Sequence, residues 1–337
     1  MTEPSNTQPE AAAIPVDLAD DGESILESDN ASSTASLTSS VLAYRKIHGR
    51  TYQNFRTSVE YWAPNDEQQN EGLDINHQMM LILNDNKLYH SPIGPNPQRV
   101  IDIGTGTGIW AVDFADEHPS AVVIGTDVSP IQPTWVPPNI KFELDDAKAV
   151  PWPYPDNHFD FLHMRLLIGS INDWPAVYNE IFRVLKPGGW VEHTEYDCAV
   201  VSDDNSQPAD AALARWGPLF LEAGEKTGQK FDLARDQKLL KWMKGAGLTA
   251  IKEYPFKLPL GSWPKERKMK DVGNLNLVMT DKSLEGYALY LFTQVLGWSV
   301  EETHVYLAKA RKELRNKSIH TYYAGITVCG QKPKRNE

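Results

Sequence analysis

Cysteines, long apolar runs and basic residues are all scarce in this sequence. Only two cysteines occur in 337 residues, Cys198 and Cys329, which excludes a disulfide framework and predicts two buried thiols. No apolar run approaches the ~18 residues that a membrane span requires, so no membrane association is expected. The first residues lack a basic segment followed by an apolar one, so the sequence predicts a cytoplasmic or nuclear protein rather than a secreted one.

Acidic residues outnumber basic residues by 45 to 33, which gives a formal net charge of −12. Residues 1–40 contain eight of the acids and no lysine, arginine or aromatic residue, so the rest of the chain carries 37 acids against 33 bases. A segment of this composition buries too little apolar surface to offset its ordering entropy, and we predict a disordered acidic tail over residues 1–40. Without a basic excess, direct nucleic-acid binding is not expected.

A strand, a glycine turn and a helix follow one another between residues 100 and 118. Residues 100–103 read as a short buried strand, residues 109–118 have helical periodicity, and the glycines between them are Gly104, Gly106 and Gly108. This arrangement brings a backbone close to a nucleotide-like ligand, with an ordinary tight turn as the alternative. A dinucleotide fingerprint would place its third glycine at Ile109, so the spacing does not favour a NAD-dependent oxidoreductase. Asp102, inside the strand, suits a cationic ligand better than a pyrophosphate.

Two more predicted strands end in acidic residues. The apolar run 121–125 leads to Asp127, which is placed to accept hydrogen bonds from both hydroxyls of a ribose. The alternative is a helix-capping role, which Pro130 and Pro133 oppose because they come too soon for a regular helix. The run 140–144 leads to two further acidic residues, Asp145 and Asp146, followed by the small residue Ala147. Because ligands of open α/β sheets bind at the carboxyl ends of the strands, we expect one ligand-binding cleft here.

Four runs of sequence resemble the fungal LaeA-like methyltransferases, the family of the velvet-complex regulator of secondary metabolism. They are residues 99–116, 125–138, 169–174 and 185–189, and the similarity extends over roughly residues 41–332. The long segment from Ile131-Gln-Pro to Trp135-Val-Pro-Pro is specific to this group. The resemblance implies an α/β fold with the Rossmann-like, seven-stranded sheet of class I S-adenosylmethionine (SAM) methyltransferases, and SAM as the cofactor.

The resemblance also implies which residues contact SAM. The expected cofactor-binding residues are Asp102, Gly104, Thr105, Gly106, Gly108, Asp127, Val128, Asp145, Asp146, Ala147 and Arg165. In methyltransferases of this type an acidic residue after the third strand accepts from the adenine amino group; we favour Asp146, with Asp145 as its competitor. The chain departs from relatives that carry arginine at the position of Gly72 and a His-His pair at His77-Gln78, which allows a different substrate.

The chain is expected to fall into two parts after the tail, the second of which contains an insertion. Residues 41–95 should form a helical lid over the cofactor, with Arg50 and Tyr52 as lid residues and His77 packed against the sheet. Residues 96–332 should form the SAM-dependent methyltransferase domain. Within it, the region 257–321 is too long for a hairpin and has helical patterns over 284–296 and 301–314, so we expect a helical insertion that roofs the substrate site.

Methyl transfer from a sulfonium depends mainly on alignment and exclusion of water, and a base is needed only if the acceptor must lose a proton. The candidates for a base are His163, Glu192, His193 and Glu195, each with a structural role as its alternative. His193 and Glu195 alone do not make a metal site, so none is expected.

Two classes of function fit these observations. The first is an enzyme that transfers a methyl group to an O or N atom of a small-molecule acceptor in fungal secondary metabolism. The alternative is a regulator of secondary-metabolite gene expression that acts in a nuclear complex with a velvet-type protein partner. Intact SAM motifs do not separate the two classes, because a regulator can also bind SAM.

Overall fold

The computed structural model describes residues 44–54 and 61–334. The expected disordered tail, residues 1–40, lies outside the described residues. Both cysteines are buried free thiols, as expected. None of the helices in the described part of the chain combines the length and apolar character needed to cross a membrane.

Nine strands and eight helices make up the described chain. The strands are β1 (Arg45–Ile47), β2 (Arg50–Tyr52), β3 (Arg99–Ile103), β4 (Val122–Asp127), β5 (Ile140–Leu144), β6 (Phe159–Arg165), β7 (Leu185–Val201), β8 (Thr249–Pro259) and β9 (Tyr322–Gln331). The helices are α1 (Glu67–Leu83), α2 (Ile109–Glu117), α3 (Trp174–Val184), α4 (Ala212–Thr227), α5 (Lys238–Gly245), α6 (Arg267–Tyr290), the π-helix η1 (Leu291–Val295) and α7 (Val300–Leu314).

Seven strands form one sheet in the order β5-β4-β3-β6-β7-β9-β8. Strands β3 to β7 pair in parallel, and β9 runs antiparallel to both of its neighbours. The chain adds strands on one side of β3 and then moves to the other side at β6, so the carboxyl ends of β3 and β6 border the switch point where α/β sheets bind ligands. The predicted seven-stranded α/β fold is confirmed.

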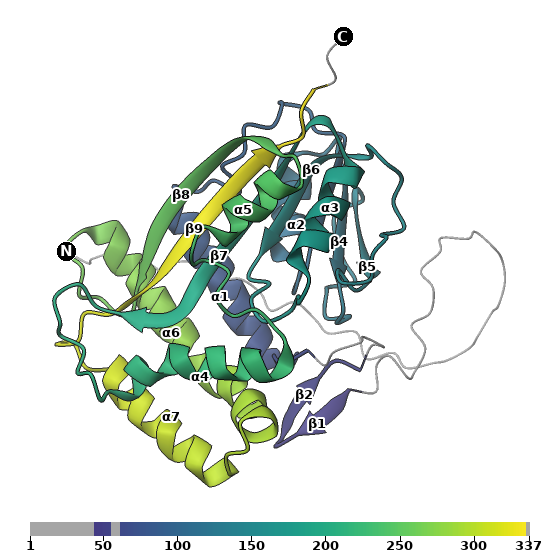
Figure 1. Cartoon of the computed structure of the whole chain (residues 1–337). Coiled ribbons are helices and arrows are strands. Elements are labelled where there is room, and N and C mark those ends of the chain that lie inside the picture. The colour runs from purple at the N-terminus through teal and green to yellow at the C-terminus, as the bar shows by residue number, and fades with distance from the viewer. Residues whose placement is uncertain (1–43, 55–60, 335–337) are drawn as a thin grey trace, which may run out of the picture. The chain divides into compact units, whose positions relative to one another are not determined.

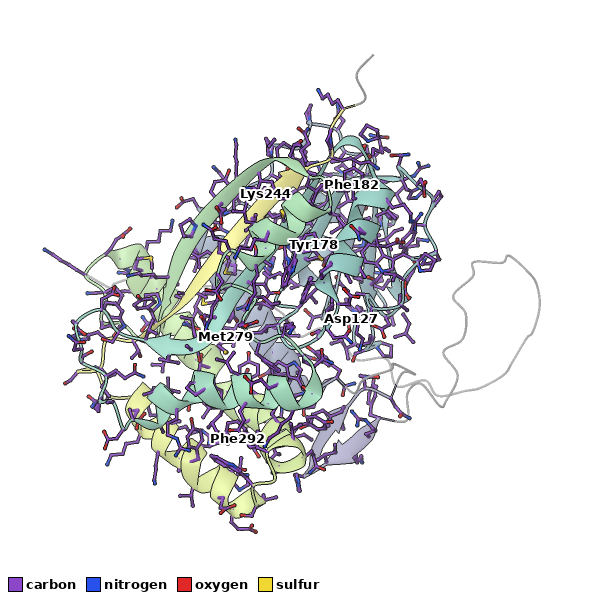
Figure 2. The ribbon with its side chains drawn as sticks, in the orientation of Figure 1. Asp127, Tyr178, Phe182, Lys244, Met279 and Phe292 are labelled. Carbon is purple, nitrogen blue, oxygen red and sulfur yellow. The ribbon has the colours of Figure 1, made fainter. Side chains whose placement is uncertain are left out.

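Helices cover both faces of the sheet and gather beyond one of its ends (Figure 1). Helices α3 and α5 lie in front of the sheet, and α4, α6 and α7 lie together below it in this view. One apolar cluster lies between the sheet and α3, and a second surrounds α2. A third lies among α4, α6 and α7 and includes residues of α1 and β7. Figure 2 marks the third cluster at Phe292 and the first at Tyr178.

The segment 41–95, expected to be helical, is only partly so. Residues 45–52 form a two-stranded hairpin, β1 and β2, and α1 is the only helix among the described residues of this segment. His48 and Gly49 form the hairpin turn with φ of 48° and 83°, as two-residue hairpin turns require. Strands of three residues are too short to display an alternating pattern, so the sequence signal was confined to Gly49.

The insertion between β8 and β9 is helical, but its first helix starts earlier than the sequence indicates. Helix α6 begins at Arg267, whereas the predicted helical pattern began at residue 284. Charged residues and Gly273 weaken the apolar periodicity of its first turns. Tertiary packing stabilises this part of α6, because small residues let the helix approach its neighbours closely. A Cβ on Gly273 would lie 2.1 Å from Gly261 O, and one on Gly286 would lie 2.4 Å from Gln69 Oε1 of α1.

Candidate functional site

A cleft lies at the carboxyl ends of β3, β4, β5 and β6. Ten of the eleven residues expected to contact the cofactor line it: Asp102, Gly104, Thr105, Gly106, Asp127, Val128, Asp145, Asp146, Ala147 and Arg165. Figure 2 marks this end of the sheet at Asp127, below Tyr178 of α3. The exception is Gly108, which lies under the ring of Phe142, where a Cβ would come within 2.4 Å of Cζ.

The glycine turn between β3 and α2 has a left-handed backbone at all three glycines. Their φ angles are 68°, 58° and 82° at Gly104, Gly106 and Gly108. At Gly108 the left-handed angle and the adjacent ring of Phe142 both disfavour a side chain, so glycine is required there for the turn to reach α2. Thr107 Oγ1 donates to Asp74 Oδ1 at 2.6 Å and so fastens the turn to α1.

Asp127, at the end of β4, holds the turn from the other side. Its Oδ2 accepts from the backbone N–H of Gly106 at 2.8 Å, and its Oδ1 accepts from Ser129 N at 2.9 Å. Burial raises the pKa of this carboxyl to about 6. Gln132, from the segment specific to the LaeA-like group, donates to Gly106 O at 2.7 Å and to Ser129 O at 2.9 Å. Sequence reasoning did not find this tether, although it did single out the segment that contains it.

Asp102 and His163 form a buried pair beneath the cleft. Asp102 Oδ1 lies 2.7 Å from His163 Nδ1, and its Oδ2 accepts from Thr105 Oγ1 at 2.6 Å. The His163 ring stacks on Trp110 with centroids 3.7 Å apart, and burial lowers its pKa. Both Asp102 oxygens are engaged, so this carboxylate organises the turn from within the protein. The contacts of His163 match the core role that we weighed against catalysis.

Arg165 brings a guanidinium to the cleft at the end of β6. Its Nη2 lies 3.2 Å from His77 Nδ1, and His77 Nε2 lies 2.8 Å from Asp113 Oδ2. An arginine can only donate, so Nδ1 of His77 accepts and its Nε2–H donates to Asp113. His77 therefore does more than pack against the sheet, because it holds Arg165 toward the cleft. Burial lowers the pKa of Arg165.

The end of β5 presents two carboxylates to the cleft. Asp145 Oδ1 accepts from Asp146 N at 2.9 Å, and Asp146 Oδ1 accepts from Lys148 N at 3.0 Å. Each carboxylate keeps one oxygen that makes no short hydrogen bond in the described chain, although Asp146 Oδ2 lies 3.9 Å from Lys148 Nζ. The choice between Asp146 and Asp145 for an adenine contact therefore stays open.

The other candidates for a base, apart from His163, lie away from the cleft in buried networks. Glu192 Oε2 accepts from His90 N, Ser91 N and Ser91 Oγ at 2.7 to 2.8 Å. His193 bonds Tyr178 Oη at 2.8 Å through Nδ1 and Glu195 Oε1 at 3.0 Å through Nε2. Glu195 Oε1 also accepts from Leu167 N at 2.6 Å, and burial raises the pKa of Glu195.

Arg50 and Tyr52, the expected lid residues, do not line the cleft. Arg50 forms a bidentate pair with Asp66, the N-cap of α1, at 2.5 and 2.7 Å. Tyr52 is fully buried and its ring centroid lies 5.6 Å from that of Tyr290. Their contacts attach the hairpin to α1 and to the end of α6, and a lid role for them stays a prediction.

Helix α1 contributes cleft residues that sequence reasoning missed. Leu73 and Asn76 line the cleft, together with Tyr61 and Ser170 from neighbouring loops. The signal was present in the sequence: Gln69, Asn76 and His77 put polar side chains on the inward face of a helix, where apolar residues are the rule. Asn76 Oδ1 and Ser170 Oγ are buried and make no hydrogen bond within the described chain. Buried polar atoms without partners at a cleft indicate a polar ligand.

A second pocket adjoins the cleft and shares Tyr61, Leu73 and Leu166 with it. Besides Tyr61, seven of its lining residues are aromatic, and they come from the loop before α1, from β7, from α4 and the loop after it, from α6 and from β9: Trp62, Tyr196, Trp216, Phe220, Phe231, Tyr287 and Tyr323. Most of these residues are far apart in sequence, so no sequence motif predicts the pocket. Among the described residues there is no group of three or more His, Cys, Asp or Glu side chains placed to hold a metal ion.

Comparison with known proteins bears on the identity of this cleft. A family model described as a methyltransferase domain matches residues 75–253. Methyltransferase pytC of Aspergillus terreus is 39% identical over 308 residues, which cover 90% of this chain and 93% of that protein. The secondary metabolism regulator LAE1 of Cochliobolus heterostrophus is 34% identical, with 82% and 90% covered. The protein-methionine methyltransferase laeA of Emericella nidulans is 32% identical, with 87% and 77% covered.

The match to the family model, residues 75–253, includes the glycine turn and the strand ends that form the cleft described above. The family expected from the sequence motifs, its enzyme class and its SAM cofactor are therefore confirmed. The chain belongs to the SAM-dependent methyltransferases related to pytC and LaeA, a group of fungal secondary metabolism.

Proposed function

We propose that this methyltransferase acts on an O or N atom of a small-molecule acceptor, with SAM in the cleft and the acceptor in the adjoining aromatic pocket. One observation carries the proposal: the two cavities share Tyr61, Leu73 and Leu166, so a ligand in one can contact a ligand in the other. Apolar pockets with a few polar groups are typical of small-molecule sites. A pocket of this kind does not suit a charged polypeptide tail.

The residues of the cleft fit SAM part by part. Because glycine has no side chain, the glycine turn lets SAM approach the protein backbone closely. The carboxylate of Asp127 can accept hydrogen bonds from the ribose hydroxyls. Asp145 or Asp146 can accept from the adenine amino group. Arg165, held by His77, offers a cation to the carboxylate of the methionine part. The unpartnered Ser170 Oγ supplies an acceptor for its ammonium group.

Bound SAM supplies the methyl group: the acceptor lone pair forms the new bond, the C–S bond breaks with its electrons left on sulfur, and the acceptor proton leaves to water. The chain's own task is alignment and exclusion of solvent. Tyr61, Leu73 and Leu166 line both cavities where they adjoin. We assign no general base, because Glu192, His193 and Glu195 lie in buried networks and His163 is bonded to Asp102.

The test is transfer of label from methyl-labelled SAM. The purified full-length chain, incubated with fractionated fungal metabolite extracts, is expected to produce labelled organic-soluble compounds that mass spectrometry identifies as methyl ethers or methylamines. The heat-inactivated chain serves as the control. Label recovered only in protein would exclude a small-molecule acceptor and favour a protein substrate.

A second candidate function is regulation within a nuclear velvet-type complex. The observation that favours it is Trp135, whose side chain is 94% exposed in the segment between β4 and β5. An indole left in water keeps a large apolar surface hydrated, and aromatic residues of this kind are enriched in protein interfaces. A nuclear or cytoplasmic location remains a prediction under either function.

Substitution of Trp135 by alanine tests whether this residue docks a velvet-type partner. If the segment docks a velvet-type protein, Trp135→Ala should weaken the complex by tenfold or more and leave SAM affinity unchanged, because hot-spot aromatic residues dominate interface energies. Affinity is measured by calorimetry with the purified partner. Equal affinity of the variant would remove the docking role from this residue.

A further inference from the structure

We propose that the aromatic pocket binds a flat, uncharged acceptor through a hydroxyl group, and that Asn76 and Tyr196 together orient this hydroxyl toward the cleft. The inference rests on the proposed function, because it takes the pocket beside the cleft as the acceptor site. It adds the chemical class of the acceptor and two positioning residues.

The walls of the pocket favour a flat ring. Trp62 lies at their centre, with ring centroids 5.4 Å from Phe231, 6.0 Å from Phe220 and 6.0 Å from Tyr287. Its only donor, Nε1–H, is used by Ile168 O at 3.2 Å, so the indole offers apolar surface alone. Aromatic surfaces on several sides of one cavity contact a planar ligand by stacking and edge-to-face packing.

The charges around the pocket favour an uncharged ligand. Asp197 is the only Asp, Glu, Lys, Arg or His among the described lining residues, and Arg235 pairs with both of its oxygens, Nη2 at 2.6 Å from Oδ1. Burial raises the pKa of the Cys198 thiol to about 12 and raises the pKa of Tyr196 and Tyr287, so these groups stay protonated at neutral pH. An ion in this pocket would lose hydration without gaining a free counter-charge from these residues.

The polar atoms favour a hydroxyl in particular. Asn76 Nδ2 donates to Tyr196 Oη at 3.1 Å, which leaves the phenolic proton of Tyr196 free of any other bond within the described chain. Asn76 is 2% exposed, and its Oδ1 is buried without a partner. The pair therefore offers one donor and one acceptor close together. A hydroxyl group both accepts and donates, whereas an ether or a quaternary ammonium cannot do both.

The position of the pair supports its orienting role. Asn76, on α1, lines the cofactor cleft, and Tyr196, near the middle of β7, lines the aromatic pocket. Their hydrogen bond therefore spans the boundary between the two cavities. A hydroxyl bonded to both residues would face the cleft, where the methyl donor binds, while its ring lies against Trp62.

Binding of three probes with one ring system tests the acceptor class. The full-length chain, loaded with S-adenosylhomocysteine, is titrated by calorimetry with 2-naphthol, 2-naphthoate and 2-naphthyltrimethylammonium at pH 7. We expect 2-naphthol to bind at least tenfold more tightly than either ion. Tightest binding of the ammonium would reveal a cation site, and tightest binding of the naphthoate an anion site; either result, or equal binding of all three, overturns the proposal.

Substitution of Tyr196 by phenylalanine tests the orienting pair. Tyr196→Phe removes the donor and keeps the ring, so we expect a five- to tenfold weaker 2-naphthol affinity and no change for naphthalene, which has no hydroxyl. Tyr322→Phe is the matched control, because Tyr322 is adjacent to Tyr323 on β9 and bonds Asp203 outside the pocket. Equal losses in the two variants, or a loss for naphthalene as large as for naphthol, would assign Tyr196 a structural role only.

The failure of this inference can be told apart from failure of the proposed function. If the labelled products of the extract assay are methylated carboxylates or quaternary amines, small-molecule methyl transfer holds and the acceptor class proposed here is wrong. If no small molecule is labelled although SAM binds, the proposed function itself fails, whatever the naphthol affinity. Labelled methyl ethers of phenols or enols, together with a raised KM for the acceptor in Tyr196→Phe, would support both.

Discussion

Replacing Asp127 with alanine is expected to weaken SAM binding by about 1–3 kcal/mol, roughly 5- to 150-fold, with the fold retained. The carboxylate has two roles in this expectation: it accepts from the ribose hydroxyls, and it holds the glycine turn through Gly106 N at 2.8 Å and Ser129 N at 2.9 Å. Titration calorimetry measures the affinity, and circular dichroism checks the fold. An unchanged Kd would refute the ribose contact.

The same contact should make SAM binding depend on pH. Burial raises the pKa of Asp127 to about 6 in the ligand-free chain, so the carboxyl is protonated below that pH and loses acceptor strength. SAM affinity is therefore expected to be highest above about pH 7 and to fall as the pH drops through about 6. The neighbouring ionisable groups are Asp102, bonded to His163 and Thr105, and Tyr61, whose raised pKa keeps it protonated.

Asp127→Asn provides the control for the pH effect. The amide keeps an oxygen acceptor but does not titrate, so its SAM affinity should be low and nearly constant between pH 5 and pH 8. A pH dependence in the variant equal to that of the parent chain would assign the titration to a group other than Asp127.

Replacing Glu192 with alanine is expected to lower the free energy of unfolding by about 3–5 kcal/mol, because three buried donors lose their partner. Glu192 is 2% exposed and its Oε2 holds His90 N, Ser91 N and Ser91 Oγ. These bonds attach the segment between α1 and β3 to the centre of the sheet. Thermal unfolding should show a midpoint lower by roughly 5–15 °C.

Two variants define the cause of that loss. Glu192→Gln keeps one carbonyl acceptor in place, so it should recover part of the stability. Glu253→Ala, on β8, removes an exposed glutamate and should change the midpoint by about 1 °C at most. A midpoint for Glu192→Ala equal to that of the Glu253 variant would show that the segment 90–91 is held by other contacts.

The sheet and the glycine turn could be predicted because both depend on local sequence. The strands predicted at residues 100–103, 121–125 and 140–144 correspond to β3, β4 and β5, since short apolar runs ending at glycine or acidic residues are strong local signals. Ten of the eleven expected cofactor residues meet at one cleft because parallel strands bring their carboxyl ends to the same edge. Local signals were weaker for the hairpin β1–β2 and for the start of α6, whose formation depends on packing.

The role of each polar side chain was not determined locally. Glu192, His193 and Glu195 lie close together on β7 and were all candidates for a base. Their neighbours in space are His90, Ser91, Tyr178 and Leu167, from three other segments. A buried carboxylate surrounded by backbone donors acts as a structural acceptor, and the sequence does not reveal which loop supplies those donors. His77 was likewise assigned to packing until its bonds to Arg165 and Asp113 were seen.

By itself, the sequence determined the edge of the sheet that binds the ligand, because the glycine turn and the acidic residues directly follow the predicted strands. Its resemblance to the LaeA-like methyltransferases indicated the class of fold and the cofactor. Only the tertiary structure decided where an acceptor can lie. The aromatic pocket combines Trp62, Tyr196 and Tyr287 from segments more than 90 residues apart, and their rings meet only after α1, β7 and α6 have packed. Such a site depends on long-range packing, which leaves no spacing pattern in the chain.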